Sequence, residues 1–151
     1  MSDTNPTVQK TAIYLGYAGL IPMIFLAAVS IIRGVNVNLV YLFVDYSVGI
    51  LCFMGGTLWG LAMGLRDKIN TAHLAMFTGI AVTLGAISAR LQSAPIAMIV
   101  LLAFGFAIVL LGEGRSGIND HMPDWYKTLR RNLSFGVLAC HAAIAFKLFT
   151  L

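Results

Sequence analysis

The sequence predicts an all-α integral membrane protein, a bundle of about five transmembrane helices with a short interfacial helix before the last span. Hydrophobic residues make up 59% of the 151 residues and charged residues only 11%, whereas an average globular chain has roughly 25% charged residues. Apolar runs long enough to cross a bilayer recur along the chain, and most charges lie between them. A soluble domain this small needs more polar surface, so lipid is the solvent that fits.

The expected spans follow from the length of the apolar runs, because a spanning helix needs about 20 apolar residues, within a range of roughly 17–25. The third run is the most polar, but its Thr and Ser hydroxyls can bond to the preceding helical turn. We include it because the positive charges would otherwise fall on the wrong sides. A single domain over residues 1–151 is therefore expected, with spans at about 11–32, 39–65, 72–89, 95–112 and 133–151.

The basic residues between the spans predict the orientation in the membrane. The richer side receives Lys10, Arg66, Lys68, Arg115, Lys127, Arg130 and Arg131, and the poorer side receives Arg33 and Arg90, with Lys147 near the end of the last span. This bias predicts that the N-terminus is inside and the C-terminus outside. The N-terminal segment has neither a signal-peptide cleavage site nor the Arg-rich composition of a transit peptide. A bacterial inner (cytoplasmic) membrane is therefore the expected location.

A polar segment before the last span has helical character at residues 123–131. Pro123 can begin a helix, and Asp124 suits its first turn. Aromatic and basic residues in such a segment are typical of a helix that lies in the membrane interface. We expect Trp125, Tyr126, Lys127, Arg130 and Arg131 to form an interfacial anchor, and the alternative is a docking surface for a partner protein.

The second span carries a glycine zipper formed by Gly49, Gly56, Gly60 and Gly64. Small residues at this spacing allow another helix to approach closely, because no side chain holds the two backbones apart. The stripe therefore predicts helix packing. The partner helix is expected within the same chain, and the alternative is a helix of another chain.

Four groups within or near the spans form the candidate ligand or polar site: Asp45, Trp59, Arg90 and His141. Asp45 would lie roughly 9 Å deep if the second helix began near Leu39, where a carboxylate is costly and functional. If the helix began near Tyr46, Asp45 would lie at the interface, which we favour. By the predicted topology Arg33 and Arg90 lie on its side of the membrane, and either can pair with it.

His141 is the histidine expected deep within the membrane. A hydrogen bond to another helix is the favoured role, and haem ligation is the alternative. A bis-histidine haem needs a second histidine at the same depth, and the predicted depths of His73 and His121 do not match. Cys52 and Cys140 lie in apolar runs far from any metal-binding spacing, so both are expected to be buried thiols. We predict no metal site and no cofactor, with haem or quinone as the alternatives.

Several function classes lack their sequence signals. The basic residues do not form a stripe with interleaved aromatics, so nucleic acid is not an expected partner. The sequence contains no phosphate-binding loop, no HExxH motif and no plausible Ser-His-Asp set. No catalytic residue is therefore assigned. The expected partners are the lipid bilayer and another membrane protein or a second copy of the chain.

Three motifs together resemble a known family. They are LGYAGLIP at 15–22, FMGGTLWGLA at 53–62, and PDWY at 123–126 with Leu129 and Arg130. The chain resembles the small inner-membrane family of bacteria and mitochondria whose animal member is transmembrane protein sixty-nine, which in bacteria is a domain of unknown function. The resemblance spans nearly the whole chain and implies the fold and the location. It implies no activity.

The leading functional hypothesis is an accessory or assembly-type subunit that packs against a larger membrane complex. It depends on the glycine zipper, the interfacial segment and the lack of a catalytic set. The alternative is a binder or carrier of a small hydrophobic ligand, such as a quinone, a lipid or haem, and it depends on Asp45, Trp59, Arg90 and His141. A membrane-embedded enzyme is the third and least favoured hypothesis, because such enzymes need more paired polar residues than this sequence offers.

Overall fold

The computed structural model describes residues 5–34, 36–65, 69–115 and 117–150. They form five long helices and one short 3-10 helix, and no strand occurs in these ranges. All five long helices are long and apolar enough to cross a membrane, so the predicted fold class is confirmed. The elements are α1 (Pro6–Ile32), α2 (Val37–Met63), α3 (Ile69–Arg90), α4 (Pro95–Arg115), η1 (Ile118–His121) and α5 (Asp124–Phe149).

Local sequence signals explain where the helices begin and end. Asn5 caps α1 by accepting a hydrogen bond from the Thr7 amide at 2.9 Å, and Pro6 fills the first helical position, where its missing N–H costs nothing. Asn36 caps α2 in the same way through the Asn38 amide, also at 2.9 Å. Gly34, with φ at 85°, allows the chain to turn between α1 and α2, because residues with a side chain rarely adopt this conformation.

The expected interfacial helix is not a separate element. Residues 124–131 are instead the first turns of α5, which continues without a break to Phe149. The physical reason is that no proline or glycine lies between Pro123 and Gly136 to end the helix. The apolar part of the helix and its polar beginning therefore form one rigid rod.

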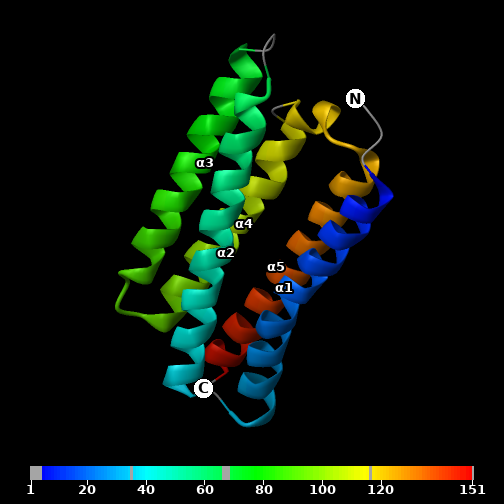
Figure 1. Ribbon diagram of the computed structural model, residues 1–151. Helices are drawn as coiled ribbons and strands as arrows, with labels where there is room; N and C mark the ends of the chain where they lie inside the picture. Colours follow the sequence, from blue (N-terminus) through cyan, green and yellow to red (C-terminus); the bar gives the residue numbers. More distant parts are fainter. Residues whose placement is uncertain (1–4, 35, 66–68, 116, 151) are drawn as a thin grey trace.

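The five long helices form two groups that pack together (Figure 1). α2, α3 and α4 follow one another as antiparallel neighbours, while α1 and α5 lie side by side and contact α2 and α4 respectively. We call the end where α1 and α5 begin the N-terminal end of the bundle, and the opposite end the C-terminal end. α1 and α2 meet near their connection at the C-terminal end and diverge toward the N-terminal end (Figure 1).

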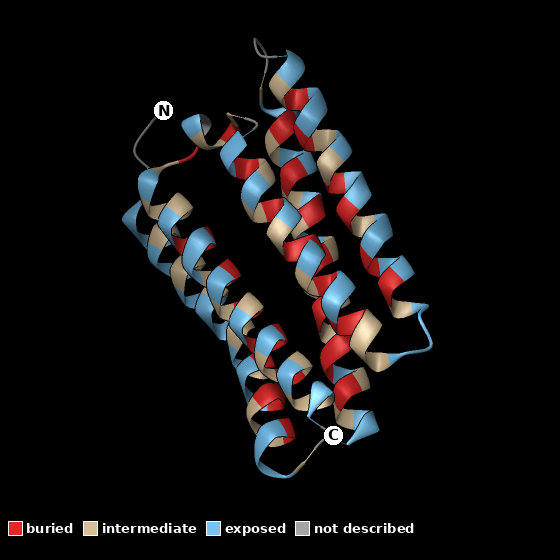
Figure 2. Cartoon of the chain, turned by 180° about the vertical axis from the view of Figure 1, so that it is seen from behind, coloured by how far each residue is buried: buried red, intermediate tan, exposed pale blue. Residues whose placement is uncertain are grey.

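Burial follows the expected pattern of a membrane bundle. Buried residues line the inward faces of the helices, and exposed residues cover the outward faces (Figure 2). The outward faces carry many large apolar side chains, among them Tyr14, Ile21, Phe77, Phe104 and Phe146. Water would solvate such a surface poorly, whereas a bilayer solvates it well.

Two glycines outside the predicted zipper, Gly55 and Gly79, form a close contact between helices. A Cβ atom on Gly55 of α2 would lie 2.6 Å from the backbone oxygen of Gly79 on α3, and one on Gly79 would lie 2.6 Å from the backbone oxygen of Gly55. No real side chain tolerates such a distance. These two glycines therefore allow the backbones of α2 and α3 to touch.

The zipper glycines do not pack within the chain, and the expectation of an internal partner helix is wrong. Among the described residues, no atom of a packing neighbour lies within 4 Å of the Cβ position of Gly49, Gly56 or Gly60, and Gly64 is the cap that ends α2. All four are exposed. The reason is a shift of one residue: α2 turns Gly55 toward α3, so Gly56 faces outward about 100° away.

Candidate functional site

A buried ion pair lies near the N-terminal end of the bundle. Glu113 comes from the last turn of α4, and Arg130 comes from the second turn of α5. The guanidinium donates a hydrogen bond through Nη2 to the Glu113 carboxylate. Only 8% of the Arg130 side chain and 6% of the Glu113 side chain is exposed. Charges buried this deeply must be paired, because burial removes their hydration.

Two hydroxyl groups complete the surroundings of Arg130. Its Nη1 donates to Thr57 Oγ1 at 3.1 Å and to the Tyr126 hydroxyl at 3.3 Å. The guanidinium carbon also lies 5.7 Å from the centre of the Tyr126 ring. The Nε–H is buried and has no partner among the described residues. Arg130 thus joins α2, α4 and α5 while one of its donors remains unused.

A cavity of about 380 Å³ lies between α1, α2 and α5, and Arg130 and Tyr126 form part of its wall. This size is within the range of small-molecule sites, roughly 300–1,000 Å³. The wall is mostly apolar, and its polar side chains, Tyr126, Arg130 and Ser134, all come from α5. The remaining lining residues are Ala12, Leu15, Gly16, Gly19, Leu20, Ile50, Phe53, Met54, Leu129, Leu133 and Val137.

The lining residues place the cavity between the first half of α1, the middle of α2 and the first half of α5. Glycines on α1 help to form it: Gly16 brings α1 close to Leu133 of α5, and a Gly19 Cβ atom would have no neighbour within 4 Å among the described residues. The Tyr46 hydroxyl donates to the Gly19 backbone oxygen at 2.7 Å. This bond ties α2 to α1 at one border of the cavity.

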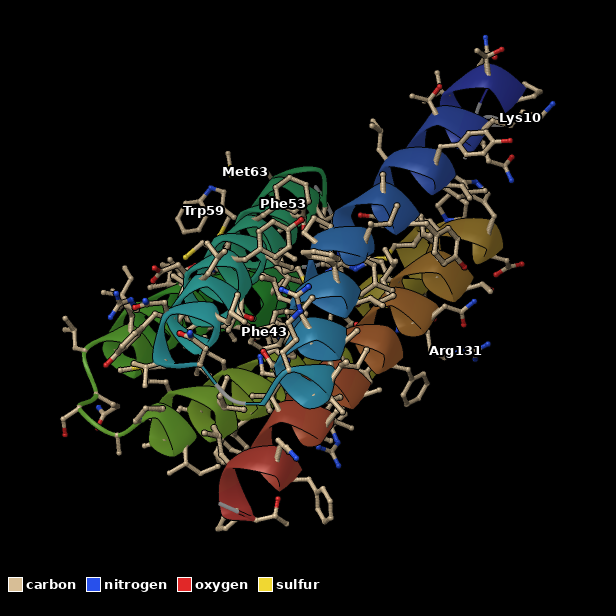
Figure 3. The ribbon with its side chains drawn as sticks, turned by 90° about the horizontal axis from the view of Figure 1, so that it is seen from below. Lys10, Phe43, Phe53, Trp59, Met63 and Arg131 are labelled. Atoms are coloured by element: carbon tan, nitrogen blue, oxygen red, sulfur yellow. The ribbon has the colours of Figure 1, made fainter. Side chains whose placement is uncertain are left out.

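The mouth of the cavity lies on the apolar outer surface. Phe53 on α2 is 72% exposed and Leu15 on α1 is 68% exposed, although both belong to the lining. Figure 3 shows Phe53 on the outer side of α2. In a bilayer these side chains face lipid, so the opening between α1 and α2 leads from the membrane interior into the cavity.

A second hollow, of about 510 Å³, lies on a different face of α5 and is mainly polar. It is lined by Leu110, Glu113, Asn119, Asp124, Lys127, Thr128 and Arg131. Asp124 and Lys127 form an ion pair within it at 2.8 Å. Glu113 lines this polar hollow and Arg130 lines the apolar cavity, so the ion pair lies between the two.

Three of the residues that sequence reasoning assigned to the interfacial anchor, Trp125, Lys127 and Arg131, are exposed or half-buried. Figure 3 shows Arg131 on the outer side of α5. Arg130 was wrongly expected beside them: it points into the bundle. Tyr126 is half-buried and lines the cavity. The reason is helical spacing, since Tyr126, Arg130 and Ser134 are four residues apart and share the inward face of α5.

The four residues of the predicted polar site do not come together. Asp45 and Arg90 form an ion pair at the C-terminal end of the bundle, where their side chains are 52% and 41% exposed. Arg90 also lies over the Tyr41 ring, 5.2 Å from its centre. Trp59 is exposed on the outer face of α2 beside Met63 (Figure 3). None of the four lines the cavity.

His141 is fully buried between Phe43 and Phe106, with ring centres 4.8 and 5.3 Å away. The expected hydrogen bond to another helix is wrong: Nδ1–H donates at 2.9 Å to the Val137 carbonyl of the same helix. Its Nε2 atom has no partner within the part of the chain that the structure describes. Bulky aromatic rings fill the space where a partner from α2 or α4 would have to lie.

Sequence reasoning missed Glu113, Thr57 and Ser134. Glu113 was expected at the start of a loop, because the apolar run ends at Gly112. The spacing of Tyr126, Arg130 and Ser134 could have revealed the site, because it places Arg130 on the same helix face as the apolar residue Val137. Cys52 is half-buried and Cys140 is buried, and both are free thiols. The described residues contain no group of three His, Cys, Asp or Glu side chains suited to a metal ion.

The fold and this site define a class of protein, a polytopic helical membrane protein with a cavity inside its bundle. The chain belongs to DUF3429, a family of proteins of unknown function, whose model matches residues 8–146. Comparisons with curated proteins and with solved structures give no match. The resemblance to transmembrane protein sixty-nine remains a prediction.

Proposed function

We propose that this protein binds a small hydrophobic ligand, a quinone or a lipid, in the cavity between α1, α2 and α5. The observation that carries the proposal is a mostly apolar cavity with a few polar groups on one helix. This combination is typical of ligand sites, where apolar walls supply affinity and a few polar groups fix the orientation. The mouth beside Leu15 and Phe53 supports entry of the ligand from the bilayer.

Haem is not supported as the ligand. His141 does not line the cavity, and the rings of Phe43 and Phe106 cover it. Cys52 and Cys140 do not line the cavity either. Of the side-chain types that ligate haem iron, the described lining holds Met54 and Tyr126, and the Tyr126 hydroxyl already accepts from Arg130. A quinone or a lipid needs only apolar walls and hydrogen-bond partners.

The first test is gentle purification from the native membrane followed by mass spectrometry of the extracted small molecules. We expect one hydrophobic compound at a fixed ratio to the protein. Gly19→Leu should reduce its amount strongly, because the leucine side chain would occupy space in the cavity. Gly85→Leu on α3 is the matched control, since Gly85 also has open space beside it and lies outside the cavity.

An equal amount of the compound in both variants would mean that it binds elsewhere. The proposal would be contradicted outright if the small molecules extracted with the wild-type protein had the same composition as those of the surrounding bilayer.

The second candidate function is an accessory subunit of a larger membrane complex. The specific observation in its favour is that Gly49, Gly56 and Gly60 face outward on α2, beside exposed Trp59 and Met63 (Figure 3). A helix of another protein could approach α2 closely there. If this role is correct, Gly56→Leu should abolish co-purification of a stoichiometric partner, while Gly85→Leu should not. Identical partner recovery from both variants would count against it.

We further propose the inner membrane of a bacterium as the location, with the N-terminal end of the bundle in the cytoplasm. The charge bias supports this orientation, although Arg66 and Lys68 lie outside the described residues. A reporter that works only in the periplasm should be active when it is fused to the C-terminus. A reporter that works only in the cytoplasm should be inactive at the same position. The reverse pattern would overturn the orientation.

A further inference from the structure

We infer that the cavity selects a neutral ligand whose polar end is a hydrogen-bond acceptor, a carbonyl oxygen carried on an apolar body. The inference rests on the proposed ligand-binding function and narrows it to a chemical class. Two independent observations lead to it. One is the charge balance of the Glu113–Arg130 pair, and the other is the set of hydrogen-bond donors and acceptors around the guanidinium.

The charge balance argues against an anionic ligand. Among the described residues of the cavity wall, Arg130 is the one cationic side chain and none is acidic. Its charge is already balanced by Glu113 from α4, and both side chains are almost fully buried. An anionic head would compete for the same guanidinium and would leave Glu113 as a buried carboxylate without its partner, which is costly. A neutral head leaves the pair intact.

The hydrogen-bond inventory argues for an acceptor. The Thr57 hydroxyl accepts from Arg130 and donates its proton to the Met54 carbonyl at 2.7 Å, so it has no proton left for a ligand. The Tyr126 hydroxyl accepts from Arg130, so its own proton remains free to donate. The Nε–H of Arg130 is enclosed by protein atoms, so a ligand in the cavity does not reach it. The Tyr126 proton is therefore the free donor on the wall that a carbonyl oxygen can accept from, and the Ser134 hydroxyl can donate beside it.

A carbonyl oxygen on an apolar body can come from two sources, a quinone or an esterified lipid. Both sources present a neutral carbonyl acceptor at the end of a hydrophobic molecule. The two differ in shape, because a quinone ring is flat and rigid whereas an ester lies on a flexible chain. The experiment below therefore includes one probe of each kind.

The test measures binding of radiolabelled probes to the full-length protein in nanodiscs of a zwitterionic lipid, with empty nanodiscs as the background. The probes are methyl decanoate, a decyl benzoquinone, decane and decanesulfonate, which is permanently anionic. We expect one or both carbonyl probes to bind up to roughly tenfold more tightly than decane and decanesulfonate, as a hydrogen bond from a wall hydroxyl predicts. The carbonyl probe that binds more tightly indicates whether the ligand is a quinone or an esterified lipid.

Two variants test the physical cause. Glu113→Gln removes the counter-charge while keeping the shape, so decanesulfonate should now bind more tightly than methyl decanoate. Tyr126→Phe keeps the ring but removes the hydroxyl proton, so the preference for carbonyl probes over decane should fall. Asp124→Asn is the matched control, because this acid is exposed and lies outside the cavity wall. It should leave the order of the probes unchanged.

The outcomes separate this inference from the proposed function. Equal binding of decane and the carbonyl probes, or tighter binding of decanesulfonate to the wild type, would overturn the inference and leave the cavity as a ligand site. Binding of no probe above the empty nanodiscs would overturn both. The wild-type ranking decides the question even if a variant fails to fold.

Discussion

Two arginine–carboxylate pairs lie near opposite ends of the bundle and differ mainly in burial. The Asp45–Arg90 pair at the C-terminal end has side chains that are about half exposed. The Glu113–Arg130 pair at the N-terminal end is almost completely enclosed by α2, α4 and α5. Both arginines lie near a tyrosine ring, Tyr41 and Tyr126 respectively. The same chemical groups thus occur in two different environments.

Burial should decide how much each pair contributes to the stability of the fold. Exposed ion pairs contribute little, because each charge keeps most of its hydration when the other is lost. A buried pair has no such alternative, so each charge depends on its partner. The buried pair also adjoins the cavity, whereas the exposed pair does not. We therefore expect substitutions at the two pairs to differ strongly in their effects on both stability and ligand binding.

The largest effect should come from Glu113→Ala. It leaves Arg130 as a buried cation without a counter-charge, and the expected loss of unfolding free energy is about 3–5 kcal/mol. Denaturation in mixed detergent micelles, followed by circular dichroism, measures the loss. Asp45→Ala is the matched control at the exposed pair. Similar losses in the two variants would show that burial does not separate the pairs.

Removing both buried charges should reverse most of that loss. Glu113→Leu combined with Arg130→Met replaces the pair with apolar side chains of similar length, and such replacements are often neutral or stabilising by about 1–4 kcal/mol. A double-mutant cycle measured by the same denaturation assay gives the coupling between the two positions. The double variant keeps the Tyr126 hydroxyl, so it should still bind methyl decanoate more tightly than decane. Additive losses would mean that the two residues act independently.

A smaller effect is expected from Tyr126→Phe. The change removes a hydroxyl that accepts from Arg130 and offers a free proton to the cavity. The expected loss of stability is about 0.5–1.5 kcal/mol, with weaker binding of carbonyl probes and unchanged binding of decane. Tyr14→Phe, at an exposed position of α1, is the control. Loss of affinity for decane as well would indicate a change in the shape of the cavity rather than in its hydrogen bonding.

The fold could be predicted from the sequence because the length and polarity of each apolar run depend on local composition alone. The site could not, because it depends on which face of each helix turns inward. Asp45 attracted attention as an acid within an apolar run, yet it lies in an exposed pair. Glu113 and Arg130 lie 17 positions apart along the chain, and only the packing of α4 against α5 brings them together.

The glycines of α2 show the same limit in a simpler form. Spacing by four residues identifies a stripe of small residues but not the side of the helix that meets a neighbour. Gly55 contacts α3, and its sequence neighbour Gly56 faces outward. A pattern read from one helix carries no information on the position of the next one, so the direction of packing had to come from the three-dimensional structure.

The smallest effect should come from Asp45→Asn. The substitution removes one charge of the exposed pair but leaves the Arg90 side chain 41% exposed and over the Tyr41 ring. The expected loss of stability is about 0–1 kcal/mol, and it should shrink further at high salt because salt screens exposed charges. Denaturation at low and high ionic strength measures both. A loss as large as that of Glu113→Ala, and insensitive to salt, would place Asp45 in an environment as dry as the buried pair and remove the contrast between the two ends of the bundle.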